Sequence, residues 1–412
     1  MLTLSRGILN SYGTFQTYYV TELLQGSSPS AISWIGSIQT FCFMTVAVVM
    51  GPLFDMGYSR PLIVAGAGFE IVGFMLTSIS TKYWQILLAQ GVCVGLGTCC
   101  LSIPSMAIVP LYFYKRRALA MATATVGSGL GSTLYPLIFQ RLQVQVGFGW
   151  AMRTMGFMSF AMCLFALTVL KPRRSPERPA WQTGGLSWRW FIDLSAFKEP
   201  SYIIYSVAIF FNNLAFFIPS YYLQSYALAN GMRGVQLASY LLSIMNSASI
   251  PGRIIPSYIA DKVGSLDTYV VVCTLSSATI FYWLSVVNIA GNVAFAVMWG
   301  LFSGGAVALA NVVLTGITPD LTRLGTRLGM VSIIKGLGSL IGPPISGAIL
   351  DRSGSYMGVQ LFSAFGMMLT AVLMLGLRLD LARRTWKGGA RQDPATDPRG
   401  GKGGKGRKGL AG

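Results

Sequence analysis

Histidine is absent from this chain of 412 residues, and acidic residues are few, with 13 Asp and Glu against 31 Lys and Arg. Without an imidazole, any proton-coupled step must use a carboxyl group or a proton carried by a bound molecule. The six cysteines lie in apolar segments without metal-ligand spacing or a disulfide framework, and we interpret them as small core residues. We therefore expect no enzymatic activity, no cofactor and no metal.

Charge of either sign is scarce as well. Charged residues make up 11% of the chain and hydrophobic residues 53%, and the mean hydropathy is +0.58. A soluble protein needs a more polar surface than this, so the composition indicates a polytopic membrane protein with the lipid bilayer as its environment. The net charge of +18 does not indicate nucleic-acid binding, because the basic residues lie between apolar segments and in the tail.

Apolar segments of about 20 residues, each long enough to cross a bilayer as a helix, recur along nearly the whole sequence. We predict an all-α membrane protein with twelve transmembrane helices in two pseudo-symmetric six-helix bundles, at residues 1–170 and 201–380. Residues 171–200 are predicted to be a cytoplasmic linker, and residues 381–412 a basic, glycine-rich disordered tail. Basic residues gather in alternate loops, which predicts that both termini are cytoplasmic.

An internal repeat supports two related halves. The turn after the second span, with Gly51 and Asp55, has a counterpart after the eighth span, and the segment that follows Arg117 is echoed after Arg327. We assign the charged residues of these turns to conformational gating rather than to binding: Asp55, Arg60, Arg117, Asp261, Lys262 and Arg327. Glycines at i, i+4 spacing are expected to be helix-packing faces: Gly91, Gly95, Gly127, Gly131, Gly300, Gly304, Gly338 and Gly342.

Several motifs resemble the major facilitator superfamily, and within it the fungal members of the monocarboxylate-porter branch. They are GPLFDMGYSRP at 51–61, YFYKRRALA at 112–120, DLSAFKEP at 193–200, GRIIPSYIADKVG at 252–264 and TPDLTRLGTRLGM at 318–330. The resemblance implies a secondary transporter and a substrate-binding arginine at Arg253, but it does not carry over proton coupling. It also implies a longer first span, so we expect the first helix to be truncated. The aspartate that animal relatives use for proton coupling is replaced by Ser249.

Charged residues inside the spans point to a site, because burying a cation near the bilayer midplane costs at least ~2.5 kcal/mol. Arg253 can hold a carboxylate through two parallel hydrogen bonds, or it can pair with Asp261 in a gate. Lys335 either adds positive potential to a cavity or extends toward the cytoplasm. Glu70 is a candidate proton site, with a hydrogen-bonded structural acid as the alternative.

Uncharged polar groups in the spans also need partners. Asn10, Tyr12, Asn212 and Asn246 either line a path for a polar substrate or hydrogen-bond between helices.

We predict an alternating-access carrier of a small organic anion, a monocarboxylate, moved with a proton or by facilitated exchange. It is expected to be a monomer in the plasma membrane. Two alternatives stay open. One is export of a larger secondary metabolite, and the other is a membrane sensor that has kept the fold without transporting.

Overall fold

The computed structural model describes residues 7–55, 58–107, 117–169, 193–230, 237–318 and 324–389. Every regular element in these ranges is a helix, and no strand occurs among them. The predicted all-α class is therefore confirmed. The predicted linker and tail lie mostly outside these ranges.

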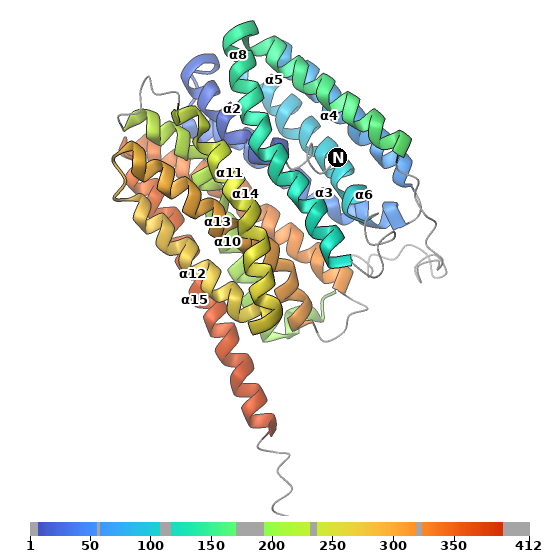
Figure 1. Ribbon diagram of the computed structural model, residues 1–412, viewed down its shortest axis with the longest axis vertical. Coiled ribbons are helices and arrows are strands. Elements are labelled where there is room, and N and C mark those ends of the chain that lie inside the picture. The colour runs from blue at the N-terminus through green and yellow to red at the C-terminus, as the bar shows by residue number, and fades with distance from the viewer. Residues whose placement is uncertain are drawn as a thin grey trace, which may run out of the picture.

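The first half begins with a helical stretch at residues 7–10. Its elements are α2 (Tyr12–Tyr18), η1 (Tyr19–Leu23), α3 (Pro29–Asp55), α4 (Ser59–Ile79), α5 (Tyr83–Ile86), η2 (Leu87–Val94), α6 (Gly95–Ala107) and α8 (Arg117–Val169). At Gly147 the backbone of α8 turns back with φ 82°, in the left-handed region that glycine adopts without strain. The two arms of α8 therefore correspond to the fifth and sixth predicted spans (Figure 1).

The second half is likewise a series of helices. Its elements are η4 (Ala196–Lys198), α10 (Pro200–Ala229), α11 (Leu237–Val263), α12 (Ser265–Trp283), α13 (Ile289–Ile317), α14 (Leu324–Ser353) and α15 (Tyr356–Gly389). α15 continues past residue 380, where the tail was expected to begin. Residues 381–387 contain no proline and consist mostly of good helix formers, which explains the extension.

Eight of the described helices are long and apolar enough to cross a membrane. Of the other described helices, three are absent from the eight: α2 is short, α11 carries Arg253, Asp261 and Lys262, and α12 contains Asp267 and several serines and threonines. The outward face of α4 exposes large apolar side chains at Val64, Phe69, Val72 and Leu76. Because such a stripe would be unfavourable in water, this face fits contact with lipid.

In three of the four predicted glycine pairs, both glycines lie close against a neighbouring helix, as a packing role requires. A Cβ on Gly300 would lie 2.1 Å from the carbonyl oxygen of Met245, so α13 lies directly against α11. A Cβ on Gly342 would lie 2.0 Å from the carbonyl oxygen of Leu214, so α14 lies directly against α10. Only a residue without a side chain allows two backbones to approach this closely.

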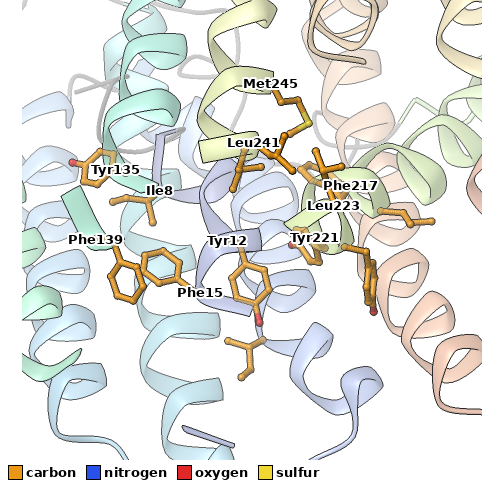
Figure 2. Packing of buried hydrophobic residues seen from close by; sticks show 14 of the residues in the cluster. Ile8, Tyr12, Phe15, Tyr135, Phe139, Phe217, Tyr221, Leu223, Leu241 and Met245 are labelled. Carbon is orange, nitrogen blue, oxygen red and sulfur yellow. The ribbon is translucent and has the colours of Figure 1, made fainter. Parts of the chain in front are cut away.

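The two halves meet through α2 with α10, α3 with α14, and α8 with α11. Figure 2 shows the aromatic layer at this boundary, where the ring centroids of Tyr12 and Tyr221 are 4.8 Å apart. A Cβ on Gly13 would lie 1.9 Å from the carbonyl oxygen of Ser220. The hydroxyl of Ser30 donates to the carbonyl oxygen of Pro344 at 2.9 Å. These contacts close one end of the boundary, which we call the closed end.

Candidate functional site

A cavity of about 280 Å³ lies between the two halves, and we call it the central cavity. The first half lines it with Leu9, Asn10, Thr40, Phe43, Met44, Ala47, Cys99, Ser102 and Ile103. The second half lines it with Asn212, Asn213, Phe216, Phe217, Arg253, Ala306, Val307, Ala310, Asn311, Ser332 and Lys335. An apolar wall with a few amides and cations is typical of a small-molecule binding site.

Two of the lining residues are cations. Arg253 on α11 donates from Nη1 to the Oγ of Ser128 on α8, at 2.5 Å. Lys335 on α14 donates from Nζ to the Oδ1 of Asn311 on α13, at 2.8 Å. These bonds hold both charged groups at the cavity, which gives it a positive potential. Asp261 lies eight residues after Arg253, or about 12 Å along the helix axis.

Two amide side chains beside Arg253 bond Ser132 of α8, that of Asn10 within the first half and that of Asn246 across the halves. Asn10 donates from Nδ2 to the Oγ of Ser132 at 3.0 Å, and Asn246 donates from Nδ2 to the carbonyl oxygen of Ser132 at 3.0 Å. Asn10, Asn246 and Arg253 also line a small adjoining cavity of about 30 Å³. Asn212 lines the central cavity from α10. The structure thus brings together five of the six predicted binding residues.

Tyr12 is the exception, because it does not line the central cavity in this structure. Its side chain is buried, and its hydroxyl donates to the carbonyl oxygen of Ile32 at 2.6 Å. The ring packs against Tyr221 at the closed end rather than lining the central cavity (Figure 2). A phenol can bury its ring and bond a backbone carbonyl at the same time, so its polarity alone did not require a cavity.

Several lining residues were not predicted. Asn311 is the lone amide in an apolar run of α13, and this signal was available in the sequence. Asn213 follows Asn212 directly. Ser128 gave no signal, because a serine in a transmembrane helix ordinarily bonds its own backbone.

Glu70 lies inside the first half, away from the central cavity. Its side chain is fully buried, and its Oε1 accepts a hydrogen bond of 3.1 Å from Ser159. Its Oε2 has no hydrogen-bond partner among the described residues. Tyr135 and Cys163 are its titratable neighbours. The acid is thus only half satisfied, which suits a group that takes up a proton.

The residues assigned to gating are dispersed. Arg60 is exposed at the start of α4, and Asp261 and Lys262 are exposed at the end of α11, where Lys262 Nζ lies 4.5 Å from the Tyr258 ring centroid. The side chains of Asp55 and Arg117 lie outside the described residues.

Arg327 differs from Arg60, Asp261 and Lys262 because it is buried, with 2% exposure. Its Nε lies 3.1 Å from Asp193 Oδ2, and its Nη1 and Nη2 donate to the two carboxylate oxygens of Glu199 at 2.8 and 2.6 Å. We call these three residues the Arg327 cluster. It ties the segment before α10 to the start of α14, within the second half.

The comparisons with known proteins agree with this architecture. A sequence profile of the Major Facilitator Superfamily matches residues 3–298 and 258–408. The chain is similar in fold to a crystal structure of a variant of the nucleoside transporter NupG, with a TM-score of 0.73 at 14% identity, over 92% of this chain and 100% of that chain.

Among curated proteins, the chain is 36% identical to the Aspyridones efflux protein apdF of Emericella nidulans, over 90% of this chain and 74% of the relative. It is 34% identical to the Agnestins efflux protein AgnL12 of Paecilomyces divaricatus, over 92% and 84%. It is 31% identical to the Fujikurins efflux protein of Gibberella fujikuroi, over 91% and 79%. These names do not support the narrower monocarboxylate-porter branch. The chain is a membrane transporter that belongs to the major facilitator superfamily.

Proposed function

We propose that this protein exports an organic molecule of the size of a secondary metabolite. The observation that carries the proposal is the central cavity, whose volume of about 280 Å³ is walled by aromatic and aliphatic side chains. A monocarboxylate of a few carbons would fill only a fraction of this volume and would leave most of the wall without contact. Its volume lies just below the range of about 300–1,000 Å³ that is common for sites of drug-sized molecules.

The relatives support the same choice, since three of them are named as efflux proteins for aspyridones, agnestins and fujikurins. The two cations of the cavity, Arg253 and Lys335, support one part of the first prediction, that the cargo is an anion. A positive potential favours a cargo that carries an acidic group, and a guanidinium can bind such a group through two hydrogen bonds. The proposed cargo is therefore a largely apolar molecule with one acidic group.

Transport would proceed by alternating access between the two halves. In this proposal both termini face the cytoplasm, the membrane is the plasma membrane and the carrier works as a monomer. The closed end then faces outward, and cargo enters the central cavity from the cytoplasm. Inter-half hydrogen bonds such as that of Thr17 with Ser225, at 3.1 Å, would break when the carrier opens outward.

The first test compares cargo classes in vesicles that contain the purified protein. We expect a labelled aromatic polyketide with one acidic hydroxyl group to cross the membrane faster than in empty vesicles, and labelled lactate to cross at the empty-vesicle rate. Arg253→Gln should slow the acidic polyketide about tenfold, the effect of losing one charge-assisted hydrogen bond. Lys82→Gln, which changes an exposed lysine outside the cavity, is the matched control. Rapid lactate transport without polyketide transport would restore the monocarboxylate prediction.

A second test concerns proton coupling, for which Glu70 is the proposed site. Glu70→Gln keeps the shape of the side chain and fixes it in a neutral state. We expect this variant to lose the stimulation of polyketide export by a pH gradient while keeping transport down a concentration gradient. Asp351→Asn, at an exposed residue of α14, serves as the control. If the gradient stimulates Glu70→Gln as strongly as the parent, Glu70 does not bind the coupled proton.

A further inference from the structure

A second cavity, of about 330 Å³, lies at the closed end, and we call it the distal cavity. Residues of α2 and η1, α8, α10 and α11 line it, so both halves contribute. It is lined by Thr14, Thr17, Tyr18, Thr21, Glu22, Phe139, Gln140, Arg141, Gln143, Val144, Gln145, Gln224, Leu228 and Tyr240. None of these residues lines the central cavity.

Closely packed groups separate the two cavities. The backbones of α2 and α10 touch at Gly13 and Ser220, with no room for a side chain between them. The rings of Tyr12 and Tyr221 lie against each other in the same layer, at 4.8 Å between centroids. The distal cavity is therefore a compartment of its own rather than an arm of the central cavity.

Its chemistry differs from that of the central cavity. The polar groups are mostly side-chain amides and hydroxyls, and the apolar wall includes the rings of Phe139 and Tyr18. The charged lining residues are one acid, Glu22, and one base, Arg141, whose charges balance. The central cavity carries two cations by contrast. The distal cavity thus suits an uncharged aromatic molecule that forms hydrogen bonds.

Two polar atoms point to a ligand. Thr14 and Gln224 are buried, at 3% and 8% exposure, and both line the distal cavity. Thr14 Oγ1 and Gln224 Oε1 have no hydrogen-bond partner among the described residues. A buried polar atom without a hydrogen bond is destabilising, because it has lost its contact with water and gained no partner. A hydroxyl group in the cavity can donate to Gln224 Oε1 and exchange a hydrogen bond with Thr14.

We propose that the distal cavity is a second binding site, which takes neutral aromatic molecules bearing hydroxyl groups. Thr14 and Gln224 hold the hydroxyl groups, and the rings of Tyr18 and Phe139 contact the aromatic body. During export, cargo occupies this site after it leaves the central cavity. This last role rests on the proposed export function, whereas binding in the distal cavity does not.

Binding is tested with the fluorescent phenol umbelliferone, titrated into the full-length protein in lipid nanodiscs, in a buffer acidic enough to keep its hydroxyl protonated. Gln224→Leu removes an oxygen that no described group bonds, so the variant should stay folded, as its thermal midpoint will show. We expect it to weaken umbelliferone binding about tenfold, the effect of one lost hydrogen bond. Leu228→Trp, which fills the cavity with a larger side chain, should weaken binding as well.

Asn311→Leu, in the central cavity, is the matched control and should leave umbelliferone affinity unchanged. A carboxylated analogue of umbelliferone should bind less tightly than the neutral phenol. If affinity falls in Asn311→Leu but not in Gln224→Leu, the probe binds the central cavity and the proposal is overturned. Equal affinity in all variants overturns it too. If umbelliferone binds as expected but the vesicles export no polyketide, the site stands and its role in export falls.

Discussion

Replacing Arg327 with alanine is expected to lower the thermal midpoint of the purified protein by several degrees, the largest stability loss that we predict for this chain. The variant leaves the carboxylates of Asp193 and Glu199 side by side without their cation. Removing one partner of a buried ion pair typically costs about 3–5 kcal/mol, and the partial exposure of Glu199 places this case near the lower end. Thermal unfolding in detergent, followed by tryptophan fluorescence, measures the shift.

The Arg327 cluster also predicts a pH dependence. Hydrogen bonds from Arg327 lower the pKa of Glu199. At Asp193, burial alone would raise the pKa, but hydrogen bonds from Ser195 and Arg327 outweigh it and lower the pKa. Groups with lowered pKa values contribute stability that is present above their ordinary values, about 4, and is lost as the pH falls through the lowered values. The parent should therefore lose more stability below about pH 4 than Arg327→Ala does.

Two controls isolate the effect of burial. Arg378→Ala breaks the ion pair between Arg378 and Asp267, whose side chains are 41% and 39% exposed, respectively. Because an exposed ion pair contributes little, this variant should change the thermal midpoint little. Combining Arg327→Met with Asp193→Asn and Glu199→Gln removes all three charges and should recover much of the loss. If Arg327→Ala unfolds at the temperature of Arg378→Ala, the cluster does not stabilise the fold.

Gly13→Ala is expected to reduce export to the level of empty vesicles while the protein still folds. The added Cβ would lie 1.9 Å from the carbonyl oxygen of Ser220, and backbone atoms cannot move aside as a flexible side chain can. α2 and α10 must then separate, so the closed end cannot form and alternating access stops. Transport of the polyketide in vesicles, together with the thermal midpoint, measures both effects.

The glycines offer matched controls for this prediction. Gly26→Ala meets no atom within 4 Å and should behave as the parent does. Gly342→Ala meets the carbonyl oxygen of Leu214 within the second half, so it should lower the thermal midpoint rather than block closure alone. Parental transport by Gly13→Ala would mean that α2 and α10 need not touch during the cycle.

The fold was predictable because a membrane helix needs a long apolar run, and these runs are visible without any knowledge of contacts. Much of the candidate site was predictable for a related reason. Arg253, Lys335 and Asn212 interrupt apolar helices, and such groups must find a cavity or a partner. Tyr12 lies outside the central cavity, where the carbonyl oxygen of Ile32 satisfies its hydroxyl.

The Arg327 cluster was not predictable from spacing. Glu199 lies 128 positions and Asp193 lies 134 positions from Arg327, and nothing local in the sequence pairs residues at such separations. The distal cavity escaped prediction as well, since glutamines and threonines near helix ends are ordinarily hydrated and give no signal of enclosure.

The turn at Gly147 makes α8 a helical hairpin, and its two arms contact different sites. One arm carries Ser128 and Ser132, which bond Arg253 and Asn246 across the halves, and the other carries Ser159, which bonds Glu70. If the hairpin tilts as a rigid body when the halves separate, Ser159, the hydrogen-bond donor to Glu70, moves as well. If Glu70 binds the coupled proton as we propose, proton and cargo affinities are then linked, and each ligand changes the affinity for the other by the same factor.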